Sequence, residues 1–362
     1  MSLETFLDIR LGDPAISVSL NYNGLAFGTM MGRLVYYNFS TQQERVINEL
    51  SEEYIPGVWL SSDNTLYASI GDAKVLIVSS LHCEKVRKHY FLHDKPHTSA
   101  NCQNTQVQMS QDSVCLFSVE PDYGLEIEIP HLTSPVFVAK LSLQATKRVE
   151  GVRFPPYSMP FDFDEERLLW MEWQAEGNRV LNILKISGNA MTSPIAVFPK
   201  QYGKVSFARL LNDIVVFVHN FRKIKVLDIV SGEEKFGVGV HKSDVVALKV
   251  VRFVSIAECS NLDSQMNMNT NIRTDSSRNL LLSADLKGYI CIWDADNAFE
   301  LAEVIHIPSL VELTKEYRKK QYFGMGYPYV INCCGPRIAI STDYGVLVIK
   351  SRFLESIGVV HS

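Results

Sequence analysis

The sequence predicts an all-β fold, a seven-bladed β-propeller made of four-stranded antiparallel blades. Two observations lead to this prediction. The apolar segments are short and rich in Val, Ile, Leu, Phe and Tyr, with turn residues between them. Similar positions recur at shortest intervals of about 41 to 44 residues, which suits one four-stranded blade per repeat. With 362 residues, the chain has room for seven such units.

The predicted strands follow one another as a meander. Near the N-terminus they occupy residues 16–20, 25–29 and 34–39, and turn-forming pairs such as Asn23-Gly24 and Asp63-Asn64 separate strands. The same pattern continues to the end of the chain, whereas long amphipathic helical patterns are nearly absent. This favours antiparallel strands over a mixed α/β fold.

The repeat is clearest when residues 279–296 are aligned with residues 24–38. Gly288 then matches Gly32, and in both segments the next strand ends in an aromatic residue followed by a small polar one. Counting equivalent turns along the chain gives Gly32, Ala73, Gly124, about Asn178, Arg222, Gly288 and Gly345. These positions define the seven predicted blades.

We expect one domain over residues 1–362, with two interruptions. Residues 256–278 are rich in Asn, Ser and Asp and predict a flexible polar insertion, because they cannot bury enough apolar surface. Residues 308–322 place apolar side chains at helical spacing, which predicts a short surface helix, with a partner-binding helix as the alternative. The strand predicted over residues 5–11 is left to pair into the seventh blade and close the ring.

Composition narrows the class of protein. The net charge of -5 provides no global basic field for nucleic acid. No basic segment followed by an apolar core opens the chain, and Lys249 and Arg252 interrupt its longest apolar run, so we expect neither a signal peptide nor a transmembrane segment. Seven cysteines without regular spacing suit a reducing compartment. The expected location is therefore cytoplasmic, with cytoskeletal association left open.

Residues 241–306 resemble a WD repeat. The segment that ends in Trp293-Asp294 is similar to the end of such a repeat, and His241 is similar to the histidine that opens one. The resemblance implies a structural hydrogen-bond set, which here would be His241, Ser283, Asp285 and Trp293. One residue departs from the pattern. The family's turn aspartate usually lies six positions before the tryptophan, where this chain has Lys287, so Asp285 completes the set only if the turn is shifted.

The same segment disfavours two other functions of propeller proteins, that of a cullin ubiquitin ligase adaptor and that of a sialidase. WD-repeat adaptors of cullin ubiquitin ligases often carry an arginine two positions after the Trp-Asp pair, where this chain has Asp296. The Asp-box of sialidases places one residue between its aspartate and glycine, whereas two residues separate Asp285 from Gly288. The WD-type interpretation fits the spacing better than the enzymatic one.

Standard catalytic strings are missing, and the remaining polar clusters favour ordinary structural roles. The segment 323–328 has two glycines but lacks the third that a dinucleotide loop needs. Residues 82–102 contain four histidines and two cysteines, which are chemically suitable zinc ligands, but their spacing suits a helix and the segment reads as strand and loop. The acidic run 162–167 is expected to form a solvated turn. We therefore expect no enzyme activity, no metal and no cofactor.

The function expected from the sequence is a non-enzymatic protein-interaction scaffold in a larger cytoplasmic or cytoskeletal assembly. Its partners would be other proteins in a multi-subunit complex rather than nucleic acid. The alternative is a propeller recruited to membranes by phosphoinositides. The phosphoinositide-binding propeller family has a Phe-Arg-Arg-Gly motif. Residues 221–224 resemble its first half, since they lack the second Arg and the Gly, and Arg222 and Lys223 are the candidate lipid-binding residues.

Overall fold

The computed structural model describes residues 5–49, 54–55, 57–60, 65–70, 75–80, 86–90, 106–110, 113–120, 124–131, 134–141, 162–163, 167–173, 179–187, 190–197, 205–239, 241–253, 278–313 and 330–357. These residues form seven four-stranded sheets in which neighbouring strands pair antiparallel. The predicted all-β class with four-stranded antiparallel sheets is confirmed.

In six sheets the strands pair in sequence order. Sheets one to three contain β2 (Ala15–Leu20), β3 (Gly24–Thr29), β4 (Arg33–Asn38) and β5 (Gln43–Glu49); β6 (Gly57–Leu60), β7 (Thr65–Ile70), β8 (Val75–Ser80) and β9 (Val86–Tyr90); and β10 (Gln106–Ser110), β11 (Ser113–Glu120), β12 (Gly124–His131) and β13 (Ser134–Leu141). Sheets four to six contain β14 (Asp162–Phe163), β15 (Arg167–Trp173), β16 (Arg179–Ser187) and β17 (Ala190–Val197); β18 (Val205–Leu211), β19 (Ile214–His219), β20 (Lys223–Asp228) and β21 (Glu234–Val238); and β22 (Val245–Phe253), β23 (Arg278–Asp285), β24 (Tyr289–Asp294) and β25 (Glu300–His306).

Sheet seven joins the two ends of the chain. It contains β26 (Ile331–Cys334), β27 (Arg337–Thr342) and β28 (Gly345–Lys350), and β1 (Thr5–Arg10) pairs antiparallel with β28 as its fourth strand. Gly345 allows this close pairing, because a Cβ atom there would overlap the carbonyl oxygen of Ile9. A strand from the N-terminus thus completes a sheet of three C-terminal strands.

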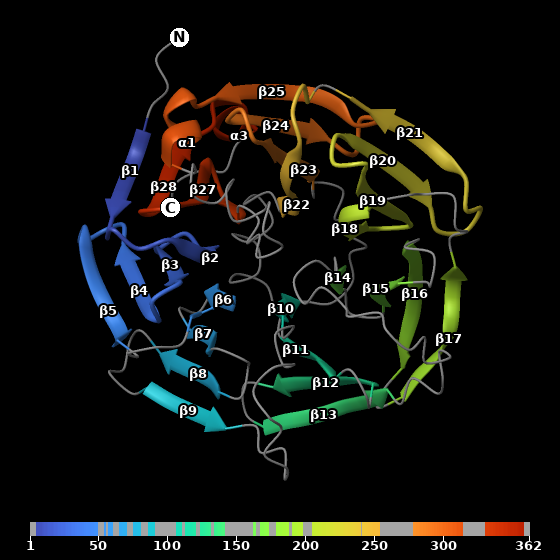
Figure 1. Cartoon of the computed structure of the whole chain (residues 1–362), viewed down its shortest axis with the longest axis horizontal. Coiled ribbons are helices and arrows are strands. Elements are labelled where there is room, and N and C mark those ends of the chain that lie inside the picture. Colours follow the sequence, from blue (N-terminus) through green and yellow to red (C-terminus); the bar gives the residue numbers. More distant parts are fainter. Residues whose placement is uncertain are drawn as a thin grey trace, which may run out of the picture.

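The sheets follow one another around a common centre, with their first strands innermost and their fourth strands outermost (Figure 1). Apolar clusters lie between neighbouring sheets. Alternate residues of β23 illustrate this, since Leu281 packs with sheet five while Leu280 and Leu282 pack with sheet seven. Both faces of the strand are buried, which explains its continuous apolar sequence.

The junction of sheets seven and one is held by side chains from both ends of the chain. The guanidinium of Arg337 lies over the rings of Phe39 and Phe6, 4.4 and 5.1 Å from their centroids, and Arg337 also donates to the carbonyl of Tyr22 at 3.1 Å. Asn332 adds a bond from its side-chain amide to the carbonyl of Val18. These contacts tie sheet one to the sheet that contains β1.

Two short helices of the described part of the chain lie beside the last sheets. The helix α1 (Pro308–Leu313) covers the start of the segment predicted as helical, and its Leu310 is buried in the core; residues 314–322 lie outside the described residues. The helix α3 (Arg352–Ser356) begins at Ser351, whose hydroxyl caps the amide of Leu354 and also bonds to Glu303 in β25. Among the described residues, no helix is long and apolar enough to cross a membrane.

Two other predictions concern the polar insertion 256–278 and the acidic run 162–167. The polar insertion 256–278 lies outside the described residues except for Arg278, which begins β23. The expectation of a solvated turn at the acidic run is wrong for Asp162, which is buried in β14, where its carboxylate accepts the amide N–H of Leu210 at 2.6 Å. A satisfied acceptor between two adjacent sheets explains why this carboxylate is buried.

Candidate functional site

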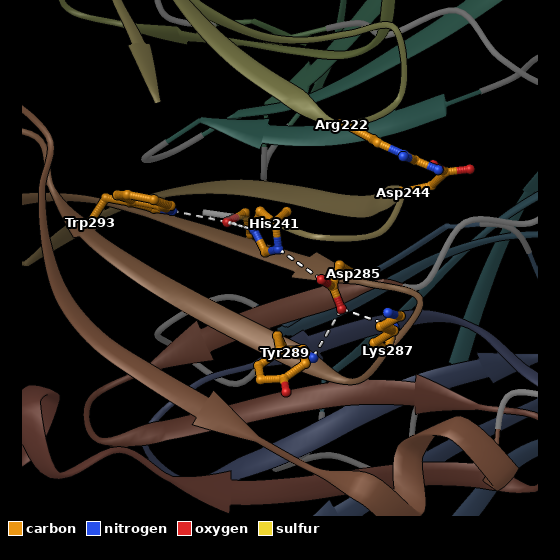
Figure 2. A network of polar contacts seen from close by, with 8 residues as sticks. Arg222, His241, Asp244, Asp285, Lys287, Tyr289 and Trp293 are labelled. Carbon is orange, nitrogen blue, oxygen red and sulfur yellow. Dashed lines mark hydrogen bonds and ion pairs between the residues drawn. The ribbon is translucent and has the colours of Figure 1, made fainter. Parts of the chain in front are cut away.

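The four residues of the predicted hydrogen-bond set lie together in sheet six (Figure 2). His241 precedes β22, Ser283 and Asp285 lie in β23, and Trp293 lies in β24. His241 Nε2 lies 2.7 Å from Ser283 Oγ, and Trp293 Nε1 donates to the same oxygen at 2.9 Å. His241 Nδ1 lies 3.2 Å from a carboxylate oxygen of Asp285. The set therefore links three consecutive parts of one sheet.

The chemistry of the two end groups fixes the direction of the bonds at both ends of this network. An indole N–H can only donate and a carboxylate can only accept. Trp293 therefore donates to Ser283, and His241 Nδ1–H donates to Asp285, whereas the direction of the bond between His241 Nε2 and Ser283 depends on the protonation of the imidazole. In its neutral form the imidazole carries its proton on Nδ1, and Nε2 accepts the Ser283 hydroxyl. A fully satisfied buried network of this kind favours one packing of the sheet.

Asp285 also organises the turn between β23 and β24. Its second carboxylate oxygen accepts the amide N–H groups of Lys287 at 2.9 Å and Tyr289 at 3.1 Å. Burial opposes ionisation of this carboxyl group, but the bonds from His241 and Tyr289 outweigh burial and lower its pKa. The shifted turn thus places Asp285 in the network, and Lys287, at the family's usual aspartate position, has an exposed side chain.

The order Ser283, His241, Asp285 is also that of a serine-nucleophile triad. In such a triad the serine oxygen must reach a substrate, and its base must be free to take the proton. Here Ser283 is fully buried, and the side chains of His241 and Asp285 are 1% and 0% exposed. The indole of Trp293 already occupies a lone pair of the serine oxygen. The geometry fits a structural network and gives no access to a substrate.

Arg222 and Lys223, the candidate lipid-binding residues, lie at the turn between β19 and β20. Arg222 Nε donates to a carboxylate oxygen of Asp244 at 2.9 Å, across the junction of sheets five and six (Figure 2). Lys223 is exposed at the start of β20, where it pairs in register with His219. The structure does not bring the two residues together around a common acceptor; instead it pairs Arg222 with a carboxylate.

The turns between second and third strands share one face with the connections into first strands. At the junction of sheets five and six, Val245 N donates to the carbonyl of Phe221, and Leu286 N donates to the carbonyl of Asp244. At the junction of sheets seven and one, Met30 N donates to Pro14 O in the same way, and Leu11 N, directly after β1, donates to Tyr344 O. We call this side of the molecule the connection face; its described parts are residues 11–14, 30–32, 220–222, 241–244, 286–288 and 343–344.

Phe221 is the most unusual residue of the connection face. It follows Asn220 in a turn closed by a bond from Arg222 N to His219 O, and both central residues have positive φ, 48° and 65°. Turns with this φ pattern are dominated by Gly, Asn and Asp, since a larger side chain is strained there. The side chain of Phe221 is nevertheless 43% exposed.

Asp296, which stands where cullin adaptors often have arginine, has a structural partner. One carboxylate oxygen accepts the amide N–H of Asn279 at 2.6 Å, and the other accepts its side-chain amide at 2.8 Å. This two-point contact joins the end of β24 to the start of β23. The position is therefore used inside the sheet.

Comparisons with known proteins support the architecture and leave the family open. No family model matches the chain, and neither does any curated protein sequence. Among solved structures, the chain is similar to the WD40 beta propeller domain of Doa1, with 13% identity, a TM-score of 0.59 and coverage of 99% of this chain and 100% of that one. It is also similar to the computationally designed Ika8 protein, with 12% identity, a TM-score of 0.51 and coverage of 97% and 98%.

The chain has a β-propeller fold. At these identities the likeness concerns the fold alone, so the chemistry of the propeller must be judged from its own residues.

Within the described innermost strands, the pKa of two titratable side chains is shifted, that of Lys249 in β22 and that of Cys333 in β26. Burial lowers the pKa of Lys249 in β22, and the nearby guanidinium of Arg209 lowers it further, while Asp162 opposes the shift. Asp162 already accepts a backbone N–H. Among the described innermost strands, this group therefore combines cations with a single engaged carboxylate, which is not an acid and base pair.

Other groups named from the sequence supply no described site. Burial raises the pKa of Cys334 to about 11 and also raises that of Cys333, so both thiols stay protonated at neutral pH, in keeping with strand packing. The histidine-rich segment 82–102 lies outside the described residues except for the backbone of β9. Within the described part of the chain, no group of three or more His, Cys, Asp or Glu side chains could hold a metal ion.

Sequence reasoning missed two features of the connection face. It treated Phe221 only as part of a motif, although Asn220 before it is a residue that tolerates positive φ and could have indicated the turn. Asp244, the partner of Arg222, lies 22 residues away in sequence, and no spacing rule connects them. Only the packing of sheet five against sheet six reveals that pair.

Proposed function

We propose that the chain is a closed seven-bladed propeller of the WD-repeat type and acts as a non-enzymatic protein-interaction scaffold within a larger cytoplasmic or cytoskeletal assembly. The observation that carries this proposal is that the side chains resembling a catalytic group are buried in a structural hydrogen-bond network. Ser283, His241 and Asp285 are buried in a satisfied network that stiffens sheet six, while short turns are exposed on the connection face. Among the described residues, the side chains that resemble a catalytic group stabilise the sheet, and the exposed turns are available for contacts with partners.

Further support comes from the architecture. The pairing of β1 with β28 suits a ring closed by its N-terminal strand, and the likeness to the WD40 domain of Doa1 suits the WD-type interpretation. A rigid ring presents turns from several blades with little loss of entropy on binding. Scaffold function then depends on the surface turns and not on the strands.

The phosphoinositide alternative finds no support in the geometry. Arg222 is engaged with Asp244, and a carboxylate beside the candidate lipid site repels phosphate. Co-sedimentation with phosphoinositide vesicles, repeated with the double variant Arg222→Thr and Lys223→Thr, measures this directly. We expect no binding that depends on the two residues.

The scaffold proposal is tested by native affinity purification of the intact chain, followed by measurement of the mass and composition of the complex. We expect a stoichiometric multi-protein complex, absent when an unrelated propeller with the same tag is purified. Recovery of the chain alone would contradict the scaffold function, as would turnover of a sugar or phosphate substrate by the isolated chain.

A further inference from the structure

We propose that the connection face, at the junction of sheets five and six, binds an acidic linear segment of a partner protein through an apolar anchor residue that packs on Phe221. The residues that form this docking patch are Phe221, Arg222, Lys242, Asp244 and Lys287. The inference rests on the proposed scaffold function and names the chemistry of the partner at this surface.

The first argument is the conformation of Phe221. A non-glycine residue with positive φ costs roughly 1 kcal/mol or more, and such strain is concentrated at functional positions. Phe221 has a φ of 65°, yet 43% of its surface remains exposed, so its burial within the chain stabilises the turn less than that of a core phenylalanine would. An exposed aromatic side chain on a rigid turn is the kind of anchor that dominates protein interfaces.

The second argument is charge. The chain as a whole has a net charge of -5, whereas this patch carries the cations Arg222, Lys242 and Lys287 and the single exposed anion Asp244. Asp285, the next carboxylate, lies buried beneath the patch and is held by His241. A local excess of positive charge on an acidic protein attracts acidic segments and repels basic ones.

The third argument is that the patch is held in place before any partner arrives. Backbone bonds join the Phe221 turn to Val245 and the Lys287 turn to Asp244, so the three segments form one continuous surface. Figure 2 shows the ion pair of Arg222 and Asp244 beside the Asp285 network that supports the Lys287 turn. Little ordering is needed on binding, which favours affinity.

A protein segment suits this surface better than a membrane. Asp244 is 41% exposed within the patch and would face lipid phosphates at unfavourable short range. The same carboxylate can accept N–H groups from a peptide backbone. Phe221 is also the single exposed large apolar residue of the patch, which is little area for insertion into lipid.

The experiment uses the full chain as bait for a display library of random 12-residue peptides. We expect the enriched peptides to be net acidic and to share an apolar or aromatic residue. One enriched peptide is then synthesised with a fluorescent label, together with a copy in which every acidic residue is replaced by its amide. The acidic peptide is expected to bind at least tenfold more tightly than the amide copy, with affinity that falls as salt rises.

The variants place the peptide on the patch. Phe221→Ala is expected to weaken binding at least tenfold, as for an interface anchor, and Lys287→Glu about three- to tenfold. Matched controls lie at the opposite end of the strands of sheet five, where Val230 is 87% exposed and Lys235, the second residue of β21, pairs with Asp228. Val230→Ala and Lys235→Glu should leave the affinity unchanged. Circular dichroism and thermal unfolding check that each variant is folded.

Several results would overturn the inference. These are the absence of enrichment, enrichment of basic or neutral peptides, and equal affinity of Phe221→Ala and the native chain for the acidic peptide. Binding to phosphatidylserine vesicles that is lost in Phe221→Ala would also replace the peptide with a membrane. Failure here differs from failure of the scaffold function. If Phe221→Ala still purifies with the whole complex, the patch is not the docking site, although the chain remains a scaffold.

Discussion

Two turns of this propeller have the same pattern of positive φ and a phenylalanine at the same position, but one phenylalanine is buried and the other is exposed. The turn that contains Ala298 and Phe299, between β24 and β25, has positive φ at both residues, 48° and 57°, as the turn of Asn220 and Phe221 does. In each, a phenylalanine stands at the second position, where glycine is common. Phe299 is 6% exposed and packs in the cluster that contains Trp293, whereas Phe221 is 43% exposed.

The difference in exposure indicates that Phe299 serves the stability of the fold, whereas the stability of the fold accounts less well for Phe221. Burial of a phenylalanine side chain contributes about 1.5–3 kcal/mol, which more than offsets the strain of one left-handed residue. Burial within the chain is therefore sufficient to account for Phe299 at this strained position. Phe221 buries less surface against the same strain, and the proposed partner segment would cover the part that is exposed.

The largest expected effect comes from truncating the buried member of the pair. Phe299→Ala should lower the free energy of unfolding by about 3–5 kcal/mol, because it leaves a cavity beside Trp293. Phe221→Ala, at the exposed turn, should lower it by no more than about 1 kcal/mol. Urea unfolding of both variants measures the two values, and equal losses would break the comparison.

The network beneath the exposed turns makes the next largest contribution. Asp285→Ala removes the acceptor for three partly buried N–H groups and should cost about 3 kcal/mol at pH 7. Because the folded pKa of Asp285 lies below its unfolded value, its stabilisation is present above the unfolded pKa, about 3.9, and is lost as pH falls through the folded pKa. The gap in urea midpoint between native chain and variant should narrow below about pH 4. A gap that stays constant would contradict this sign.

A smaller loss is expected from the donor at the other end of the network. Trp293→Phe keeps an aromatic ring in the core but removes the N–H that Ser283 accepts, so it should cost about 1–2 kcal/mol. The double variant Trp293→Phe with Ser283→Ala provides the control. Both substitutions remove the bond between Trp293 and Ser283, so the double variant should lose less stability than the sum of the two single losses. Additive losses would show that Trp293 acts through packing alone.

The sequence carried enough information for the strands and for the network, but not for the connection face. Alternation and turn residues predict strands because they are local properties, and the resemblance to a WD repeat implies the members of the network. The run of three leucines at Leu280 to Leu282 follows from burial between two sheets, which sequence alone does not specify. Asp162 was misjudged for the same reason, since its acceptor role depends on Leu210 in the next sheet. Contacts between sheets have no fixed spacing in the chain.

The smallest expected effect isolates the strain at Phe221 from the loss of its side chain. At positive φ glycine is favoured over alanine, so Phe221→Gly should be more stable than Phe221→Ala by about 1 kcal/mol. In ordinary strand or helix positions the order is reversed, and Val216→Gly against Val216→Ala in β19 supplies that reference. Thermal and urea unfolding of the four variants give the two differences. If Phe221→Gly is the less stable of its pair, the turn is not strained. If it is the more stable of the two and still fails to bind the acidic peptide, Phe221 is retained against a conformational cost for the contact that it makes outside the chain.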